Sequence, residues 1–466
     1  MKIRYLRKFI FLAILTSALL AMYSDAAAQP KKDQRLAEQL VKTGDKAFTQ
    51  KNYRAAVDNY AQAVALTPNN AYARYRKGFA HYSLKENDLA IVEFDAALSR
   101  GYKPAEIYKV RWVLHFENKN FEAAAQDLKL VLLQDPSNSE YLLALADINY
   151  EKGAFQEASD SYQKAILKTP NKADLFYKLA LAKSKLGDLE GQASAAQEAV
   201  KKNTQYLAES YLIIADARSK QKKRPEAIDA YERVLKAKPA VYDTYRNLAE
   251  LYRSENRIAE AIEVSKAGLR QFANDGNIYT DLSWYYSLAG DTPAAIEAGK
   301  AGTQLLPQQA LGYTNLCRAY NDGGKPELAI NACNRALSLN PNDGETNYYL
   351  GRAHAIMQKP AEADKYFKRA VIGLVEYTKN NPDYSDGFYL LGNAYAENKQ
   401  SDNALAAYRK CLELNPRFAK AQFNIGVIQI GKNNKDAALV QYRSLLDTDK
   451  ILAGKLKLEI DKLKSL

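Results

Sequence analysis

Side chains that could carry out catalysis are scarce in this chain. Its 466 residues include three histidines, His81, His115 and His354, and three cysteines, Cys317, Cys333 and Cys411. A histidine can act as a general base and a thiolate as a nucleophile, but either needs partners within hydrogen-bonding reach. No pattern typical of a zinc protease, a paired-cysteine redox site, a phosphate-binding loop or a serine hydrolase occurs in the sequence. We therefore predict a protein that is not an enzyme, without catalytic, cofactor-binding or metal-binding residues.

A repeat of about 34 residues organises the chain and must position these side chains. Proline recurs at one or two multiples of that length, with one slip of a single residue and one of seven. The prolines in this series are Pro68, Pro136, Pro170, Pro239, Pro307, Pro341, Pro382 and Pro416. A fixed period of this length indicates many copies of one small unit, stacked into a solenoid because no copy can bury its apolar face alone.

Each copy has the pattern of two helices. In the copy 310–343, Tyr313, Leu316 and Tyr320 share one face of the first half, and Ala329 and Ala336 share one face of the second. Position 20 is alanine in every copy except at Gln192, which lets the two helices approach closely. Position 15, between the helices, carries residues that tolerate the left-handed backbone at a helix end. These are Gly153, Gly187, Gly290, Gly324, Asn256 and Asn433.

The pattern closely resembles the tetratricopeptide repeat. The copy 385–418 shows the family pattern nearly whole, in Phe388, Leu391, Gly392, Tyr395, Ala404, Tyr408, Cys411 and Pro416. The resemblance implies an all-α, right-handed superhelix of about twelve helix-turn-helix copies. Their boundaries are 37–70, 71–104, 105–138, 139–172, 173–206, 208–241, 242–275, 276–309, 310–343, 344–384, 385–418 and 419–450. Two copies depart from the pattern and should pack atypically: the third, with Trp112 and Leu128, and the fifth, with Gln192 and Ala196.

This register accounts for the histidines and cysteines as packing residues. All three histidines occupy position 11, where other copies carry tyrosine, so a half-buried aromatic slot explains each of them. The cysteines fall on small or apolar core positions. An odd number of cysteines argues against a disulfide framework. Cys317 and Cys333 occupy positions 8 and 24 of one copy. Because these positions are offset along the hairpin, we expect the two cysteines to be unbridged.

The amino-terminal 28 residues have a different composition. A basic start, an uncharged stretch from Phe9 to Ser24 and the small residues 26–28 predict a secretory signal peptide cut before Gln29, with 29–36 as a short lead-in. A retained membrane anchor is the alternative, although the apolar stretch is shorter than the ~20 residues of a spanning helix. Cleavage of the predicted signal peptide, residues 1–28, would remove four basic residues and one acidic residue and lower the net charge from +12 to +9. For an exported chain we expect no nucleic-acid partner and no membrane span after cleavage.

Two segments near the carboxyl end make specific structural predictions. Between Ala370 and Pro382 the tenth copy has seven extra residues, which is two helical turns, so its second helix should be about two turns longer than its neighbours. Residues 451–466 have no following copy and should form a capping helix, with a membrane-surface helix as the alternative. The expected apolar stripe of that helix is Ile451, Leu452, Leu456, Leu458, Ile460 and Leu463.

Aromatic residues suggest a binding surface in the amino-terminal copies. In the family that this chain resembles, positions 2, 5, 9 and 12 of the first helix line a concave groove. Position 12 reads Phe48, Tyr82, Phe116 and Tyr150 in four successive copies, and the second copy adds Tyr72, Tyr75 and Phe79. Packing between copies is the alternative use of these rings. Because position 12 then becomes Ser184 and Ser219, we predict a partner site centred on Tyr75, Phe79, Tyr82 and Phe116, outside the inter-helix core.

Arginines mark the groove of the later copies. Arg318 and Arg352 share position 9 in adjacent copies, so they should stack and could bind carboxylates or phosphates. Arg246 and Arg253 lie nearby, and acidic residues at position 2 favour internal salt bridges instead. Some members of the family grip a terminal carboxylate with lysines and asparagines. Asn393 and Asn424 match those asparagines, whereas Tyr389 replaces a lysine.

These observations predict an exported, non-catalytic scaffold of the cell envelope, in the periplasm or at the cell surface, that binds proteins or extended peptides. One alternative is an accessory module that acts in trans for an envelope enzyme or a polymer-export machine. Another is an envelope glycan or peptidoglycan binder that uses the aromatic residues.

Overall fold

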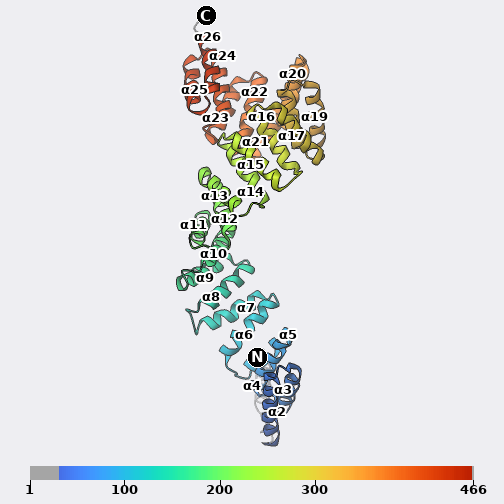
Figure 1. The fold of residues 1–466 in the computed structure, drawn as a ribbon, viewed down its shortest axis with the longest axis vertical. Coiled ribbons are helices and arrows are strands. Elements are labelled where there is room, and N and C mark those ends of the chain that lie inside the picture. The colour runs from blue at the N-terminus through green and yellow to red at the C-terminus, as the bar shows by residue number, and fades with distance from the viewer. Residues whose placement is uncertain (1–30, 464–466) are drawn as a thin grey trace, which may run out of the picture. The chain divides into compact units, whose positions relative to one another are not determined.

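The computed structural model describes residues 31–463, and this part of the chain is built from α-helices with no strand (Figure 1). It divides into two compact units at Tyr206 and Leu207. Unit 1 contains α2 (Lys31–Thr49), α3 (Tyr53–Leu66), α4 (Ala71–Ser83), α5 (Asn87–Leu98), α6 (Pro104–Glu117), α7 (Phe121–Leu132), α8 (Ser139–Glu151), α9 (Phe155–Lys168), α10 (Ala173–Lys185) and α11 (Leu189–Lys201). The predicted signal segment, residues 1–28, lies outside the described residues, and α2 already begins within the predicted lead-in.

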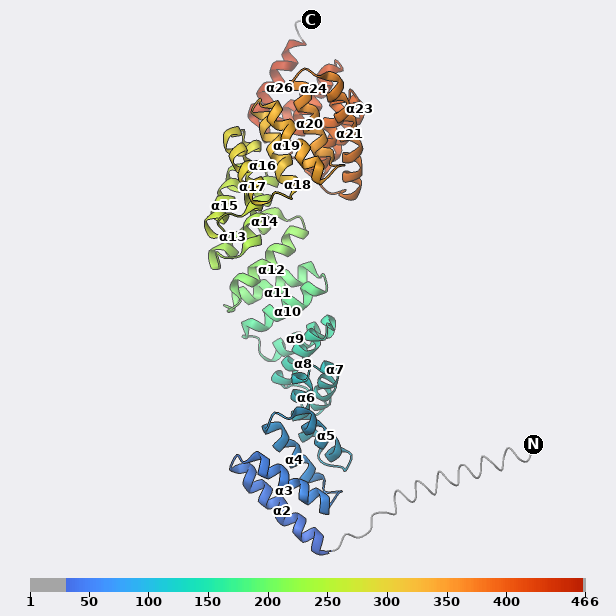
Figure 2. The same ribbon diagram turned by 90° about the vertical axis from the view of Figure 1, so that its right-hand side faces the viewer.

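Unit 2 holds the remaining helices, the later of which crowd together in both views (Figures 1 and 2). They are α12 (Leu207–Lys220), α13 (Arg224–Ala237), α14 (Tyr242–Ser254), α15 (Ile258–Gln271), α16 (Gly276–Ala289), α17 (Thr292–Leu305), α18 (Ala310–Asp322), α19 (Pro326–Leu339), α20 (Gly344–Ile356), α21 (Pro360–Asn380), α22 (Ser385–Glu397), α23 (Ser401–Leu414), α24 (Ala419–Gly431), α25 (Lys435–Thr448) and α26 (Lys450–Lys462).

The helices pair in order, from α2 with α3 to α24 with α25, which confirms the predicted helix-turn-helix organisation. Every hairpin turns through a left-handed residue at position 15. The six predicted glycines and asparagines adopt it, for example Gly153 with φ 81° and Asn256 with φ 59°. The same conformation is imposed on Lys51, Lys85, Lys119, Lys222, Gln358 and Lys399, which do not favour it. The turn therefore follows from hairpin packing as much as from local preference.

The two helices of a hairpin touch most closely at positions 8 and 24. A Cβ placed on Gly44 would lie 2.6 Å from the Tyr60 ring, and one on Gly392 would lie 2.5 Å from the Tyr408 ring. Gly78 faces Phe94 in the same way, at 2.8 Å. A missing side chain on the first helix thus makes room for a large ring on the second. The third copy reverses the sizes, with Trp112 at position 8 and Leu128 at position 24.

This contact overturns the expectation that Cys317 and Cys333 are unbridged. They occupy positions 8 and 24 of the hairpin α18–α19, and a disulfide joins them with their Cα atoms 5.3 Å apart. The two positions are offset in sequence number but face each other across the hairpin, within the range that a disulfide requires. Cys411 remains a free, buried thiol.

The predicted extension of α21 is confirmed, whereas the apolar stripe predicted for α26 is only partly buried. Helix α21 has 21 residues against 14 in α19 and α23, so the seven extra residues extend the helix as predicted. Helix α26 packs on the neighbouring helices α24 and α25 through Ala453, Leu456 and Ile460. However, Ile451 is 74% exposed and Leu458 is 66% exposed, so two of the six residues of the expected stripe face outward. Within residues 31–463, no helix has the length and apolarity to cross a membrane.

The disulfide should stabilise unit 2 measurably. It closes a loop of 16 residues, for which the chain-entropy model gives about 3 kcal/mol. We expect a reducing agent to lower the urea midpoint of unit 2 in the purified protein. The variant C317A/C333A should already have the lower midpoint and should not respond to the reductant. An unchanged midpoint on complete reduction, with both thiols titrated, would contradict the bridge.

Candidate functional site

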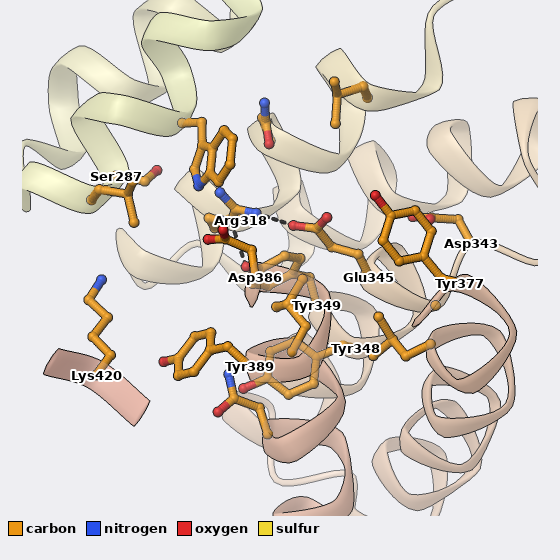
Figure 3. Close-up of a pocket in the computed structure, with 18 of the residues that line it drawn as sticks. Ser287, Arg318, Asp343, Glu345, Tyr348, Tyr349, Tyr377, Asp386, Tyr389 and Lys420 are labelled. Atoms are coloured by element: carbon orange, nitrogen blue, oxygen red, sulfur yellow. Dashed lines mark hydrogen bonds and ion pairs between the residues drawn. The ribbon is translucent and has the colours of Figure 1, made fainter. Parts of the chain in front are cut away.

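A pocket of about 400 Å³ lies in unit 2, on the inner side of the first helices of successive hairpins (Figure 3). Its walls come from α16, α18, α20, α21, α22 and α24. Most lining residues occupy positions 2, 5, 6 and 9 of their copies, among them Trp284, Arg318, Tyr348 and Tyr389. Arg318 and Arg352, predicted from the sequence, both line it, whereas the aromatic residues predicted in unit 1 do not.

Arginine and aromatic side chains alternate along one wall of this pocket. The guanidinium of Arg253 lies 4.4 Å from the centre of the Trp284 ring, and that of Arg318 lies 5.6 Å from the same ring. Arg318 is also 4.8 Å from the ring of Tyr349, and Arg352 is 6.0 Å from it. The two position-9 arginines therefore share a contact with the Tyr349 ring. Each ring offers its negative face to the cations and offsets part of the cost of burying them.

Carboxylates pair with the same arginines, as the acidic residues of the groove predicted. Arg318 is bonded to Glu345 and donates to the Tyr349 hydroxyl at 2.5 Å. Arg352 lies 3.4 Å from Asp322, and Arg246 lies 2.7 Å from Asp281. Burial raises the pKa of Glu345 and of Asp281, while the neighbouring arginines oppose that shift. Most of the charge in the pocket is thus compensated internally.

One ion pair closes unit 2 on itself. Arg253 on α14 donates to both carboxylate oxygens of Asp386 on α22, at 3.1 and 3.2 Å, across 133 residues of sequence. Only 7% of the Arg253 side chain and 11% of the Asp386 side chain are exposed. Burial disfavours the charged guanidinium, but Asp386 and Glu250 outweigh it and raise the pKa of Arg253. Nearby, the Asn415 side chain donates to the backbone oxygen of Ser254 at 3.3 Å. We call the Arg253–Asp386 pair the latch, because it joins α14 to a wall of the pocket.

The asparagines that resemble a carboxylate grip are already engaged. Asn393 Oδ1 accepts from the Tyr408 hydroxyl at 2.7 Å and from Asn424 at 2.9 Å. Asn424 also donates to the Tyr408 hydroxyl at 3.1 Å. The Tyr389 ring packs against Phe418 in a tilted arrangement, with the ring centres 4.9 Å apart, so a packing contact stands where the family has a lysine.

In unit 1, the position-12 rings pack within their own hairpins. Three of them meet a ring five residues later, at the start of the second helix, and the pairs are Phe48–Tyr53 at 5.3 Å, Phe116–Phe121 at 5.8 Å and Tyr150–Phe155 at 5.4 Å. Tyr82 has Asn87 at the matching place and packs on the core beside Phe94. In the fifth copy the partner position is Leu189 and position 12 is Ser184, so both rings of the pair are lost together. This pairing gives a packing reason for the end of the series.

The expectation that Tyr75 and Phe79 lie outside the inter-helix core is wrong. Phe79 meets the fully buried Phe94 ring at 5.4 Å, and Tyr75 stacks on Tyr102 at 4.3 Å. Burial raises the pKa of Tyr75 to about 12. Removing both rings would therefore destabilise unit 1 as well as alter any surface. Tyr72 and Phe116, 42% and 38% exposed, are the rings of the predicted set most accessible to a partner.

Comparison with known families decides the class of the protein. Models described as "Tetratricopeptide repeat" match residues 385–418, 212–276 and 315–385, and a model described as "TPR repeat" matches 44–85 and 146–187. Together these segments cover more than half of the chain and fall in both units. The chain belongs to the tetratricopeptide repeat family. Proteins of this family bind protein partners or peptides, and the repeat is typically a non-catalytic interaction scaffold.

Individual relatives share only short stretches with this tetratricopeptide repeat protein. It is 38% identical over 72 residues to "Small glutamine-rich tetratricopeptide repeat-containing protein 2" of Saccharomyces cerevisiae, which is 14% of this chain and 21% of that one. It is 30% identical over 104 residues to "Serine/threonine-protein phosphatase T" of Aspergillus oryzae, 22% of each chain. The matched region thus spans about a fifth of the length of these curated relatives.

Two solved structures are similar to this chain at low sequence identity. Yeast Tom70 is 14% identical with a TM-score of 0.36, covering 92% of this chain and 95% of its own. A tetratricopeptide repeat protein from Parabacteroides merdae is 14% identical with a TM-score of 0.39, covering 54% of this chain and 98% of its own. Likenesses this distant concern the fold alone.

The histidines behave as packing residues of the repeat. The His354 ring stacks on Tyr366 at 5.2 Å, and burial lowers its pKa. His81 lies 2.7 Å from Glu86, and burial lowers the pKa of His115. Among the described residues, no cluster of histidine, cysteine and acidic side chains could hold a metal ion.

The latch residues were missed as a pair because they are 133 residues apart and neither belongs to a recognisable motif. Trp284 was missed as well, although its place at position 9 was a usable signal once the groove positions were known. The pocket thus depends on contacts between distant copies, which the repeat pattern alone does not specify.

The latch gives a sharp stability prediction. Changing Arg253 to methionine leaves Asp386 buried without its partner, which typically costs 3–5 kcal/mol. We expect the unfolding free energy of unit 2 to fall by about that much, measured by urea denaturation. Arg257→Met is the matched control, because its ion pair with Glu260 is 45% exposed on both sides and should contribute at most about 1 kcal/mol.

Adding Asp386→Asn to the Arg253 variant should recover part of the loss, since it removes the unpaired charge. Equal effects of the Arg253 and Arg257 substitutions would show that the latch does not hold unit 2 together.

Proposed function

We propose that this protein is an exported, non-catalytic scaffold of the cell envelope that binds an extended segment of a partner protein in the pocket of unit 2. The observation that carries the proposal is the pocket itself. It is formed by groove positions of successive repeats, and Arg318 and Arg352 take part in it.

Export is supported by two features that do not depend on each other. The sequence begins with a basic, then apolar, then small-residue pattern typical of a signal peptide. The Cys317–Cys333 disulfide suits an oxidising compartment such as the periplasm or the cell exterior. Amino-terminal sequencing of the mature chain from fractionated cells should give Gln29 as the first residue, whereas an intact Met1 form in the membrane fraction would indicate a retained anchor.

A role in trans beside an envelope enzyme or export machine remains the alternative within the same binding class. Glycan binding drew its support from the aromatic residues of unit 1. The pairing of those rings within hairpins leaves fewer of them available to sugars, so a protein or peptide partner is favoured.

A matched pair of leucine variants tests the proposal. Leu311 is 49% exposed and lines the pocket, whereas Leu328 is 45% exposed on α19, away from the pocket lining. We expect Leu311→Glu to reduce the yield of a partner in a crosslinking pull-down from the native cell at least several-fold, because a charge replaces an apolar contact. Leu328→Glu should leave the yield unchanged.

Recovery of a polymer synthase or export subunit would favour the role in trans. Retention of the wild-type protein on insoluble cell wall, with no protein partner captured, would favour the glycan binder. Equal yields from the two leucine variants would contradict binding at the pocket.

A further inference from the structure

Lys420, the second residue of α24, stands unpaired at the mouth of the unit 2 pocket. Within the described part of the chain it makes no hydrogen bond or ion pair, whereas Arg253, Arg318 and Arg352 each contact a carboxylate. Its side chain is exposed, but the surrounding walls displace enough water to lower its pKa, and the positive charge of Arg318 lowers it further. An anion bound beside Lys420 would relieve both effects.

Two buried polar atoms of the same pocket also lack partners. Arg318 is only 10% exposed as a side chain, and its Nη1 has no acceptor. Ser287 Oγ likewise has no partner. Figure 3 shows the amino group of Lys420 directed toward the Ser287 side of the pocket, with Arg318 across from it. Buried donors without acceptors are costly, so this side of the pocket holds polar groups that the protein itself leaves unsatisfied.

This arrangement differs from the carboxylate grip of the tetratricopeptide family. The asparagines that match that grip are bonded to Tyr408. Arg318 and Lys420 instead come from the non-adjacent helices α18 and α24, and unit 2 brings them to one pocket because its helices close at the latch.

The pocket also offers apolar and aromatic surface. Tyr389 lies beside Lys420 in Figure 3, with Tyr348 beyond it, and Leu374, Leu390 and Phe418 are further lining residues. Leucine and ring surfaces favour apolar side chains over the hydroxyl groups of a sugar, which would lose their hydrogen bonds to water. The volume of about 400 Å³ lies within the range of small ligand sites.

We propose that the pocket binds a short peptide segment that carries one carboxylate flanked by apolar residues, with the carboxylate on Lys420. The inference rests on the proposed function and names the chemistry of the segment that the scaffold recognises. The carboxylate can belong to an acidic side chain or to a chain end, and the experiment separates these sources.

Calorimetric titration of the purified full-length mature chain tests it with three defined peptides. The first is acetyl-Leu-Phe-Glu-Leu-amide, the second is its glutamine analogue, and the third is acetyl-Leu-Phe-Leu with a free carboxyl end. We expect the glutamate peptide or the free-end peptide to bind at least about tenfold more tightly than the glutamine analogue, as for a hydrogen bond to a charged group. If the glutamate peptide binds more tightly, the carboxylate belongs to an acidic side chain. If the free-end peptide binds more tightly, it belongs to a chain end.

The variants assign the preference to one residue. Lys420→Met should abolish the tenfold preference, whereas Lys420→Arg should keep most of it. Lys455→Met is the control, because Lys455 is an exposed lysine on α26 outside the pocket lining, and this variant should bind like the wild type. Thermal melting of each variant checks that unit 2 remains folded.

The inference would be overturned if neither carboxylate peptide bound more tightly than the glutamine peptide, if the preference survived in Lys420→Met, or if none of the three peptides bound. Lys420-dependent binding of an oligogalacturonate in place of the peptides would show an acidic glycan site instead. If a partner is still captured in a Leu311-dependent manner while the carboxylate preference is absent, this inference fails and the proposed function stands.

Discussion

The close approach of two helices at positions 8 and 24 is the contact on which each hairpin depends. In four hairpins the first helix has glycine and the second fills the space with a ring, as in Gly44 with Tyr60 and Gly392 with Tyr408. Where both residues are cysteine, a covalent bond takes the place of the ring contact. Because this spacing recurs from copy to copy, the first helices of neighbouring hairpins present equivalent positions to the same side, and side chains from five of them line one pocket.

The pocket also needs contacts between copies that are not neighbours. The latch joins α14 to α22 through two almost fully buried charges, and its arginine rests on Trp284, which lines the pocket. A buried ion pair of this kind contributes little net stability compared with apolar packing, but it strongly penalises any arrangement that separates its partners. The latch therefore acts mainly to specify how unit 2 closes.

The sequence predicted those parts of the fold that follow from local preference and period. The helix pairs, the left-handed turn at Gly153 or Asn256 and the length of α21 all follow from residue type and spacing. The left-handed turns at Lys51 or Gln358 do not, because there the hairpin contacts override the residue's own preference. The disulfide was missed because position numbers do not show which residues face each other across a hairpin.

The candidate site was predicted less completely than the fold. The groove positions of the family placed Arg318 and Arg352 at the pocket, but the carboxylates that pair with them come from neighbouring copies. The pairing of Arg253 with Asp386 depends on a contact across 133 residues. The aromatic series of unit 1 predicted a partner site because aromatic residues recur at position 12 of successive copies. Its regularity reflects a ring pair repeated inside each hairpin, which is a packing solution. A partner site in unit 1 stays a prediction that rests on its exposed rings.

Photocrosslinking from single positions in the native cell tests most directly whether a partner occupies the pocket of unit 2. A benzoylphenylalanine in place of Leu311 reports on the pocket, and one in place of Tyr72 reports on the groove of unit 1; both sites are exposed, at 49% and 42%. Occupation of the pocket predicts a crosslinked protein from position 311 and little or none from position 72. A crosslink from position 72 without one from position 311 would contradict it and would place the partner in unit 1.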